Sequence, residues 1–177
     1  MHVVSVNISA GGIPKIPQPG VQVHFAGLLG DGHNHEKHRS PVQAVSLIDL
    51  ELLESMADEG HILRPGDLGE NLTCSGATLQ LRGLGDLIQF PSGLELRITK
   101  VRTPCYVLDE ISTELKRIMW NRIGLYAEVT QEGIVHPGDE CIIVEAGPGP
   151  RPAVRGVPQG STDGADEARR ILESSTP

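Results

Sequence analysis

Cys105 has the sequence neighbours best suited to chemistry among the three cysteines of the chain. It ends the segment Arg102-Thr103-Pro104-Cys105, between an expected strand and an expected helix. A thiol close to a helix N-terminus and to an arginine ionises more readily, and a thiolate is both a nucleophile and a soft metal ligand. The alternative is an inert buried thiol, since free cysteines are among the most buried residues. Cys74 and Cys141 are weaker candidates, because Cys141 lies in an apolar strand and Cys74 ends a polar loop segment.

A second set of possible ligands is the histidine-rich run His33, His35 and His38. In a strand, His33 and His35 would share one face, which suits the edge of a metal site. No cysteine or carboxylate at a familiar zinc spacing completes the set. Three interpretations stay open: a metal-binding module, a solvated polar loop, and imidazoles that donate to an anionic ligand.

A polar, glycine-rich loop, Gly66-Asp67-Leu68-Gly69-Glu70-Asn71-Leu72, leads into an apolar segment. Its backbone amides and the Asn71 side chain are able to hold a polar ligand. The alternative is an ordinary turn, in which glycine takes a positive φ and aspartate bonds the backbone beyond it. The same turn chemistry is expected at Gly85-Asp86 and Gly138-Asp139.

The overall charge limits the possible partners. The 177 residues carry 15 Lys and Arg against 23 Asp and Glu, a formal net charge of −8. This acidic balance argues against nucleic acid and against an anionic membrane surface as partners. No apolar run approaches the length of a membrane span, the N-terminus lacks a signal pattern, and the cysteines show no paired spacing. We expect a soluble, cytoplasmic protein without a disulfide framework.

The elements that position these residues are expected to be mainly strands. The chain has 21 glycines, 13 prolines and only 3% aromatic residues, so its core must consist of Val, Ile and Leu joined by tight turns. Alternating or apolar segments predict strands at 3–8, 21–25, 78–81, 86–89, 94–101, 125–130 and 140–145, and helical spacing predicts helices at 46–58 and 109–122. We therefore expect a mainly β fold, a closed or nearly closed β-barrel with two peripheral helices.

The composition changes from about Gly147 onward. The following segment is rich in proline and glycine and cannot bury enough apolar surface to order the chain. We predict one domain at 1–146 and a flexible tail at 147–177, with a possible short helix at 165–172.

Several motifs in a fixed order make a more specific pattern than any one of them. They are Gly27-Leu28-Leu29-Gly30-Asp31, His38-x-x-Pro41-x-x-Ala44-Val45-Ser46-Leu47, Gly69-Glu70-Asn71-Leu72, Arg102-x-Pro104-Cys105 and Gly133-x-Val135-x-Pro137-Gly138-Asp139. This order resembles the MOSC domain, the C-terminal domain of molybdenum cofactor sulfurases, from about Val3 to Val144. The resemblance implies a mostly β, barrel-like fold.

The resemblance also implies a function and a set of site residues. It implies binding of a molybdopterin-type molybdenum cofactor, or transport of sulfur released by pyridoxal-phosphate desulfurases. Cys105 would be the persulfide carrier or the thiolate ligand to molybdenum, and Lys15 would lie near the phosphate of the pterin. Asp31, His38 and Asn71 match the remaining pocket motifs, and Arg39 and Arg102 are further candidate cations for the cofactor.

The sequence departs from relatives at a few of these positions. Many relatives carry an arginine after the aspartate, where this chain has Gly32. A subgroup motif, His-Gly-Gly-Pro-x-Lys-Ala-Val, is matched only in part by residues 38–45, without its lysine and both glycines. Arg39 is a candidate for the missing positive charge.

These residues support three functional hypotheses. The leading one is a stand-alone MOSC domain that binds the molybdenum cofactor or transfers sulfur through Cys105, as part of an oxidoreductase or a sulfurtransferase-type activity. The second is a metal-free sulfur carrier for a cysteine desulfurase or a molybdenum-enzyme partner. The third is a non-catalytic metal-binding module that uses His33, His35 and His38. Molybdenum and pterin analysis separates the first two.

Overall fold

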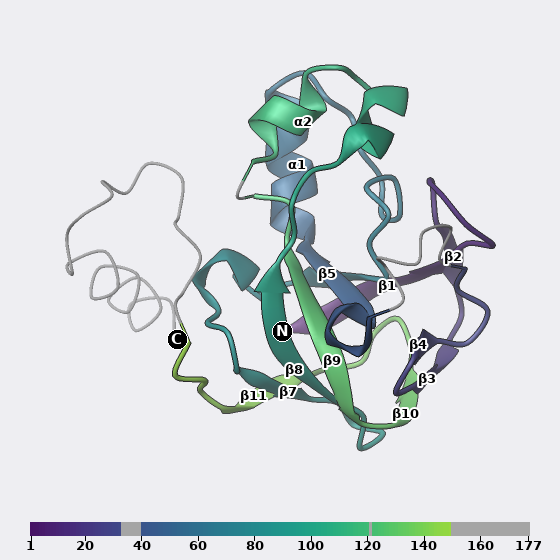
Figure 1. Ribbon diagram of the computed structural model, residues 1–177, viewed down its shortest axis with the longest axis vertical. Coiled ribbons are helices and arrows are strands. Elements are labelled where there is room, and N and C mark those ends of the chain that lie inside the picture. Colours follow the sequence, from purple (N-terminus) through teal and green to yellow (C-terminus); the bar gives the residue numbers. More distant parts are fainter. Residues whose placement is uncertain (33–39, 121, 150–177) are drawn as a thin grey trace.

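The computed structural model describes residues 1–32, 40–120 and 122–149 (Figure 1). Its main feature is an eight-stranded sheet with the strand order β11-β7-β8-β9-β5-β6-β1-β2. Neighbouring strands are antiparallel except for the parallel pair β5 and β6. The strands are β1 (His2–Ile8), β2 (Ile16–Gln18), β5 (Val45–Asp49), β6 (Leu72–Ser75), β7 (Leu87–Gln89), β8 (Glu95–Val101), β9 (Leu125–Gln131) and β11 (Ile142–Glu145).

A second, three-stranded sheet contains β10 (Gly133–Val135), β3 (Val21–His24) and β4 (Gly27–Leu28), in that order. Apolar side chains from both sheets form one buried core; Val23 and Val135 of the small sheet join Leu47 and Leu96 of the large one. The mainly β prediction is therefore confirmed, and the strands predicted around β1, β3, β7, β8, β9 and β11 are present.

The predicted closure into a barrel is not supported. In the described part of the chain the large sheet is open, with β11 and β2 as its edge strands. The start of β1 meets the segment before β11 in an isolated bridge between His2 and Glu140, with hydrogen bonds between Val3 and the backbone of Gly138 and Asp139. This contact is an isolated bridge rather than a ladder of strand pairing, and it does not close the sheet into a barrel.

The helix predicted at 46–58 is correct only from Leu50 onward. Its first residues form β5, between β9 on one side and β6 on the other, and the helix α1 (Leu50–Asp58) begins after Asp49. Leu47 and Ile48 are completely buried. Helical spacing of the leucines predicted a longer helix, but burial on both faces of the sheet favours a strand there.

Two other predicted elements are also different. In the described part of the segment predicted as a helix at 109–122, the helical elements are the end of a 3-10 helix, η4 (Tyr106–Glu110), and one turn of α-helix, α2 (Leu115–Ile118). Between them the Ser112 hydroxyl accepts the Glu114 N–H, a local bond that competes with a continuous helix. The strand predicted at 78–81 is the 3-10 helix η3 (Leu79–Leu81), whose first N–H donates to the Asp49 carboxylate.

The helices α1, η4 and α2 form a helical layer at one end of the large sheet (Figure 1). Leu52 and Met56 of α1, Leu108 of η4 and Leu115 of α2 share a second buried cluster. The chain enters this layer directly from β8 through residues 102–105, and η2 (Pro41–Gln43) precedes β5 on the neighbouring side. This path places Cys105 where the sheet meets the helical layer.

The predicted tail begins close to the end of the described chain. Gly147 N–H donates to Asp86 Oδ1 and Gly149 N–H donates to Leu84 O, so residues 147–149 pack on the turn before β7. Residues 150–177, including the possible helix at 165–172, lie outside the described residues, and the domain boundary remains a prediction. Within the described ranges, no helix has the length and apolar character needed to cross a membrane.

Candidate functional site

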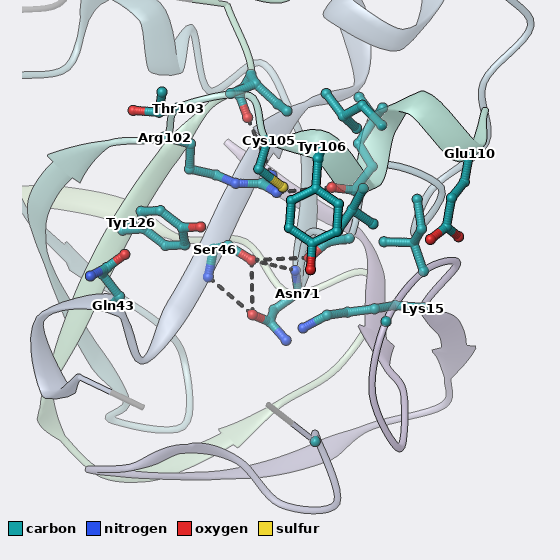
Figure 2. Close-up of a pocket in the computed structure, with 18 residues that line it drawn as sticks. Lys15, Gln43, Ser46, Asn71, Arg102, Thr103, Cys105, Tyr106, Glu110 and Tyr126 are labelled. Atoms are coloured by element: carbon teal, nitrogen blue, oxygen red, sulfur yellow. Dashed lines mark hydrogen bonds between the residues drawn. The ribbon is translucent and has the colours of Figure 1, made fainter. Parts of the chain in front are cut away.

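A pocket of about 250 Å³ lies where the large sheet meets the helical layer (Figure 2). Its wall comes from segments far apart in the sequence: the loop before β2, the segment after β4, the end of η2, β5, the loop before β6, the residues that follow β8 through η4, and the chain at the start of β9. The lining residues are Gly12, Ile13, Lys15, Gly32, Gln43, Ser46, Leu68, Gly69, Asn71, Arg102, Thr103, Cys105, Tyr106, Val107, Leu108, Glu110, Ile123 and Tyr126.

Cys105 is the accessible thiol of the chain. It is exposed and lines the pocket, whereas Cys74 and Cys141 are buried in the core. Burial raises the pKa of the Cys74 thiol well above its usual range and raises the pKa of Cys141 to about 11. The element that directly follows Cys105 is the short 3-10 helix η4, for which Cys105 is the N-terminal cap residue.

Arg102 enters the same pocket from the end of β8 and is 8% exposed. Its guanidinium donates to Leu68 O at 2.9 Å and to Ile123 O at 3.2 Å. The guanidinium carbon lies 5.6 Å from the centroid of the Tyr126 ring, a cation–π distance. Within the described residues, the guanidinium forms no ion pair and no hydrogen bond to Cys105.

Lys15 has a different environment, because a carboxylate neutralises it. Its ammonium donates to Asp31 Oδ2 at 2.5 Å, and the two side chains are 10% and 0% exposed. Burial lowers the pKa of Lys15, and the negative charge of Asp31 opposes that shift. Asp31 also accepts the Ser9 N–H through Oδ1, so both of its oxygens are occupied.

Asn71 is a structural hub of the pocket wall. Its Oδ1 accepts the Ser46 backbone N–H at 3.1 Å and the Ser46 hydroxyl at 2.9 Å. Its Nδ2 donates to Asp31 Oδ2 at 2.8 Å and to Asn7 O at 3.3 Å. The amide therefore uses both donors and both acceptor positions inside the protein.

Glu70 lies behind this wall and is fully buried. Its Oε1 accepts the Gly66 N–H at 2.6 Å and the Thr73 hydroxyl at 2.7 Å, but Oε2 has no partner among the described residues. Burial raises the pKa of Glu70, and the hydrogen bonds and the nearby Arg102 oppose this effect. The sequence motif contains Glu70, but only the tertiary structure shows its carboxyl in the interior.

The structure brings together four of the residues predicted from sequence. Lys15, Asn71, Arg102 and Cys105 line the pocket, and Asp31 lies directly behind Lys15. His38 and Arg39, like His33 and His35, lie outside the described residues. The described part contains no group of three or more His, Cys, Asp or Glu side chains placed to hold a metal ion.

Sequence reasoning missed several lining residues. Tyr106 directly follows Cys105, and Gln43 stands at the lysine position of the partly matched motif at 38–45, but neither was predicted as a site residue. Tyr126 belongs to no motif, and only long-range packing brings it to the pocket. Gly32 also lines the pocket, and a Cβ added there would lie 2.1 Å from the Ala10 carbonyl oxygen. A side chain such as the arginine of many relatives therefore does not fit at this position without movement of the backbone.

The fold is shared with known bacterial structures. The chain superposes on the YuaD protein of Bacillus subtilis with a TM-score of 0.68 and 19% identity, covering 79% of this chain and 93% of that one. YiiM from Geobacillus stearothermophilus gives 0.67 and 23%, covering 81% and 75%. YiiM from Escherichia coli gives 0.60 and 21%, covering 80% and 70%. At these identities the likeness establishes the fold alone.

The family follows from the sequence itself. The profile of the MOSC domain matches residues 32–142, more than half of the chain. The chain therefore belongs to the MOSC domain family. The matched region contains Asn71, Arg102 and Cys105 and begins immediately after Asp31. No curated protein sequence matches the chain significantly.

Proposed function

We propose that this MOSC domain binds a molybdopterin-type molybdenum cofactor in the pocket, with the Cys105 sulfur as a ligand to the metal. The observation that carries the proposal is the position of Cys105, an exposed thiol on the wall of a pocket that also holds a buried guanidinium. The family is associated with this cofactor and with sulfur transfer.

The donor set of the pocket is compatible with such a ligand. Molybdenum favours a soft sulfur ligand, which Cys105 supplies. The buried Arg102 offers N–H donors and a positive charge to an anionic group, and the Tyr106 and Tyr126 rings offer apolar faces to a planar heterocycle. When bound, the cofactor would supply redox chemistry at molybdenum. The chain's own residues would then bind and orient it.

Sulfur transfer is a second candidate function, favoured by the exposure of Cys105. The Cys105 thiolate would attack the terminal sulfur of a persulfide on a cysteine desulfurase. The sulfur–sulfur bond of the donor breaks, a new one forms on Cys105, and the donor cysteine leaves as a thiolate. The pyridoxal phosphate belongs to the desulfurase, and a cytoplasmic desulfurase or molybdenum enzyme would be the partner.

Purification from a host that makes molybdenum cofactor tests both functions. Elemental analysis and pterin fluorescence should detect molybdenum and pterin in the wild-type protein and in Cys141→Ser, but not in Cys105→Ser. Protein without metal is then incubated with a cysteine desulfurase and cysteine. A mass gain of one sulfur atom on the Cys105 peptide supports the carrier function. If Cys105→Ser retains both molybdenum and sulfur loading, both functions fail for this site.

A further inference from the structure

The two cations of the pocket are compensated in different ways. Lys15 faces a carboxylate, Asp31, that is fully buried and makes hydrogen bonds to Ser9 and Asn71 as well. The pair therefore contributes no surplus positive charge to the pocket. Asn71, which holds Asp31 in place, has no hydrogen-bonding capacity left for a ligand.

Arg102 keeps its charge without a counter-ion in the described structure. A guanidinium has five N–H donors, and two donor contacts of Arg102 have acceptors there, both of them neutral carbonyls. The contact with the Tyr126 ring and the two hydrogen bonds to carbonyls fix the orientation of the guanidinium. Arg102 lowers the pKa of Glu70, but burial raises it and is the larger effect. Among the described residues Glu70 bonds to Gly66 and Thr73 and forms no ion pair with Arg102.

A buried charge without a counter-ion is unfavourable, because desolvation is not repaid by an ion pair. An anion in the pocket would offset the desolvation cost of the Arg102 charge. It would also accept hydrogen bonds from N–H groups of Arg102 that have no acceptor among the described residues. Charge-assisted bonds from a fixed guanidinium to an oxyanion are among the stronger hydrogen bonds in proteins.

We propose that Arg102, rather than Lys15, is the anion-binding group of this pocket and that it takes an oxyanion group of a small ligand. The Lys15–Asp31 pair, held by Asn71 and the Ser9 N–H, is then part of the pocket wall. The inference rests on the proposed function in one respect, that the pocket binds an anionic ligand. It requires neither molybdenum nor a persulfide. The sequence resemblance had placed Lys15 near the phosphate of the pterin.

Sulfate is a suitable probe because its charge is constant across the neutral pH range. In wild-type protein labelled with ¹⁵N and ¹³C, titration with sodium sulfate should shift the Arg102 Nε–H resonance, with a smaller change at the Lys15 side-chain carbons. Sodium chloride at matched ionic strength controls for screening. A dominant shift at Lys15, or no binding of sulfate by the wild-type protein, overturns the proposal.

Variants give a second, independent measurement. By calorimetry, Arg102→Gln should weaken sulfate binding by about tenfold or more, because it loses a charge-assisted interaction. Arg97→Gln, on β8 and outside the pocket lining, is the matched control for loss of an arginine. The double variant Lys15→Met/Asp31→Asn removes a neutral pair and should change affinity less than about threefold. A tenfold loss in the double variant contradicts the inference.

Two further outcomes are decisive. If Arg102→Gln does not fold, the resonance shifts of the wild-type protein decide between Arg102 and Lys15. Cys105→Ser tests whether the thiolate itself is the anion beside Arg102. Unchanged sulfate affinity in this variant supports a ligand oxyanion, whereas sulfate binding that appears only in Cys105→Ser overturns it. Sulfate binding tests the role of Arg102, whereas molybdenum and sulfur loading test the proposed function. Either proposal can therefore fail while the other is supported.

Discussion

Lys15 Nζ lies 2.5 Å from Asp31 Oδ2, although 16 residues separate the two along the chain. Burial lowers the pKa of Lys15, and the charge of Asp31 raises it. Burial is the larger of the two effects, so in ¹³C spectra of lysine-labelled protein the Lys15 resonance should titrate below the ordinary lysine value of 10.5.

The Asp31→Asn variant should move this Lys15 titration to still lower pH, because the neighbouring negative charge is removed. Lys15→Arg assigns the resonance by its disappearance. A Lys15 midpoint that rises in Asp31→Asn would show that the pair does not form in solution.

Glu70→Gln should change how stability depends on pH. Burial raises the folded-state pKa of Glu70 above its ordinary value of 4.5, so the folded protein binds this proton more tightly than the unfolded chain. The resulting stabilisation is complete below pH 4.5 and is lost as the pH rises through the folded-state pKa. Because glutamine does not ionise, the variant should gain in free energy of unfolding relative to wild type over that rise.

Urea unfolding from about pH 4 to about pH 8 measures the difference between Glu70→Gln and wild type. Glu54→Gln, on the exposed face of α1, controls for the loss of one carboxylate. A difference that stays constant over the whole range would mean that Glu70 does not titrate differently in the folded protein.

Alkylation of the native protein should distinguish the three thiols. Cys105 is exposed, whereas Cys141, with a pKa of about 11, and the fully buried Cys74 expose almost no thiolate at neutral pH. Iodoacetamide should modify Cys105 at least about 100-fold faster than either of the others, as measured by peptide mass spectrometry. Comparable rates at all three cysteines in native buffer would contradict the described burial, and equal rates are expected only after denaturation.

Alanine substitutions at Gly60 and Gly66, which have the same φ of +93°, test how tightly the loop around Gly66 packs against Lys15. A Cβ at Gly60 meets nothing within 4 Å, whereas a Cβ at Gly66 would lie 2.1 Å from the Lys15 carbonyl oxygen. Gly60→Ala should cost about 1 kcal/mol of unfolding free energy from backbone strain alone. Gly66→Ala adds a backbone clash and should cost at least about 3 kcal/mol. Equal costs in chemical denaturation would show that the loop around Gly66 moves freely away from Lys15.

Local pattern predicted the strands well where one face is buried and the other is exposed. The alternation at Val21 and Val23 and along Leu94–Val101 reflects the two-residue period of a half-buried strand, which needs no knowledge of distant contacts. The same reasoning failed at Ser46-Leu47-Ile48, because a strand buried on both faces has no such period and resembles a helix in spacing.

The sequence by itself determined the mainly β class, the MOSC family and the identity of Cys105, Arg102, Lys15 and Asn71 as candidate site residues. Those conclusions depend on residue type and order, which a chain carries before it folds. Only the tertiary structure decided that Arg102 turns toward the carbonyls of Leu68 and Ile123 instead of Cys105.

Tertiary contacts also decided which charges of the site are already neutralised. Asp31, which follows β4 of the small sheet, reaches Lys15 before β2 and Asn71 before β6 of the large one, and Glu70 is buried beside them. Pairing and desolvation are properties of the space around a side chain, which depends on segments many residues away. For that reason the sequence named residues of this pocket, but only the fold showed that Lys15 pairs with a carboxylate, whereas Arg102 bonds to neutral carbonyls among the described residues.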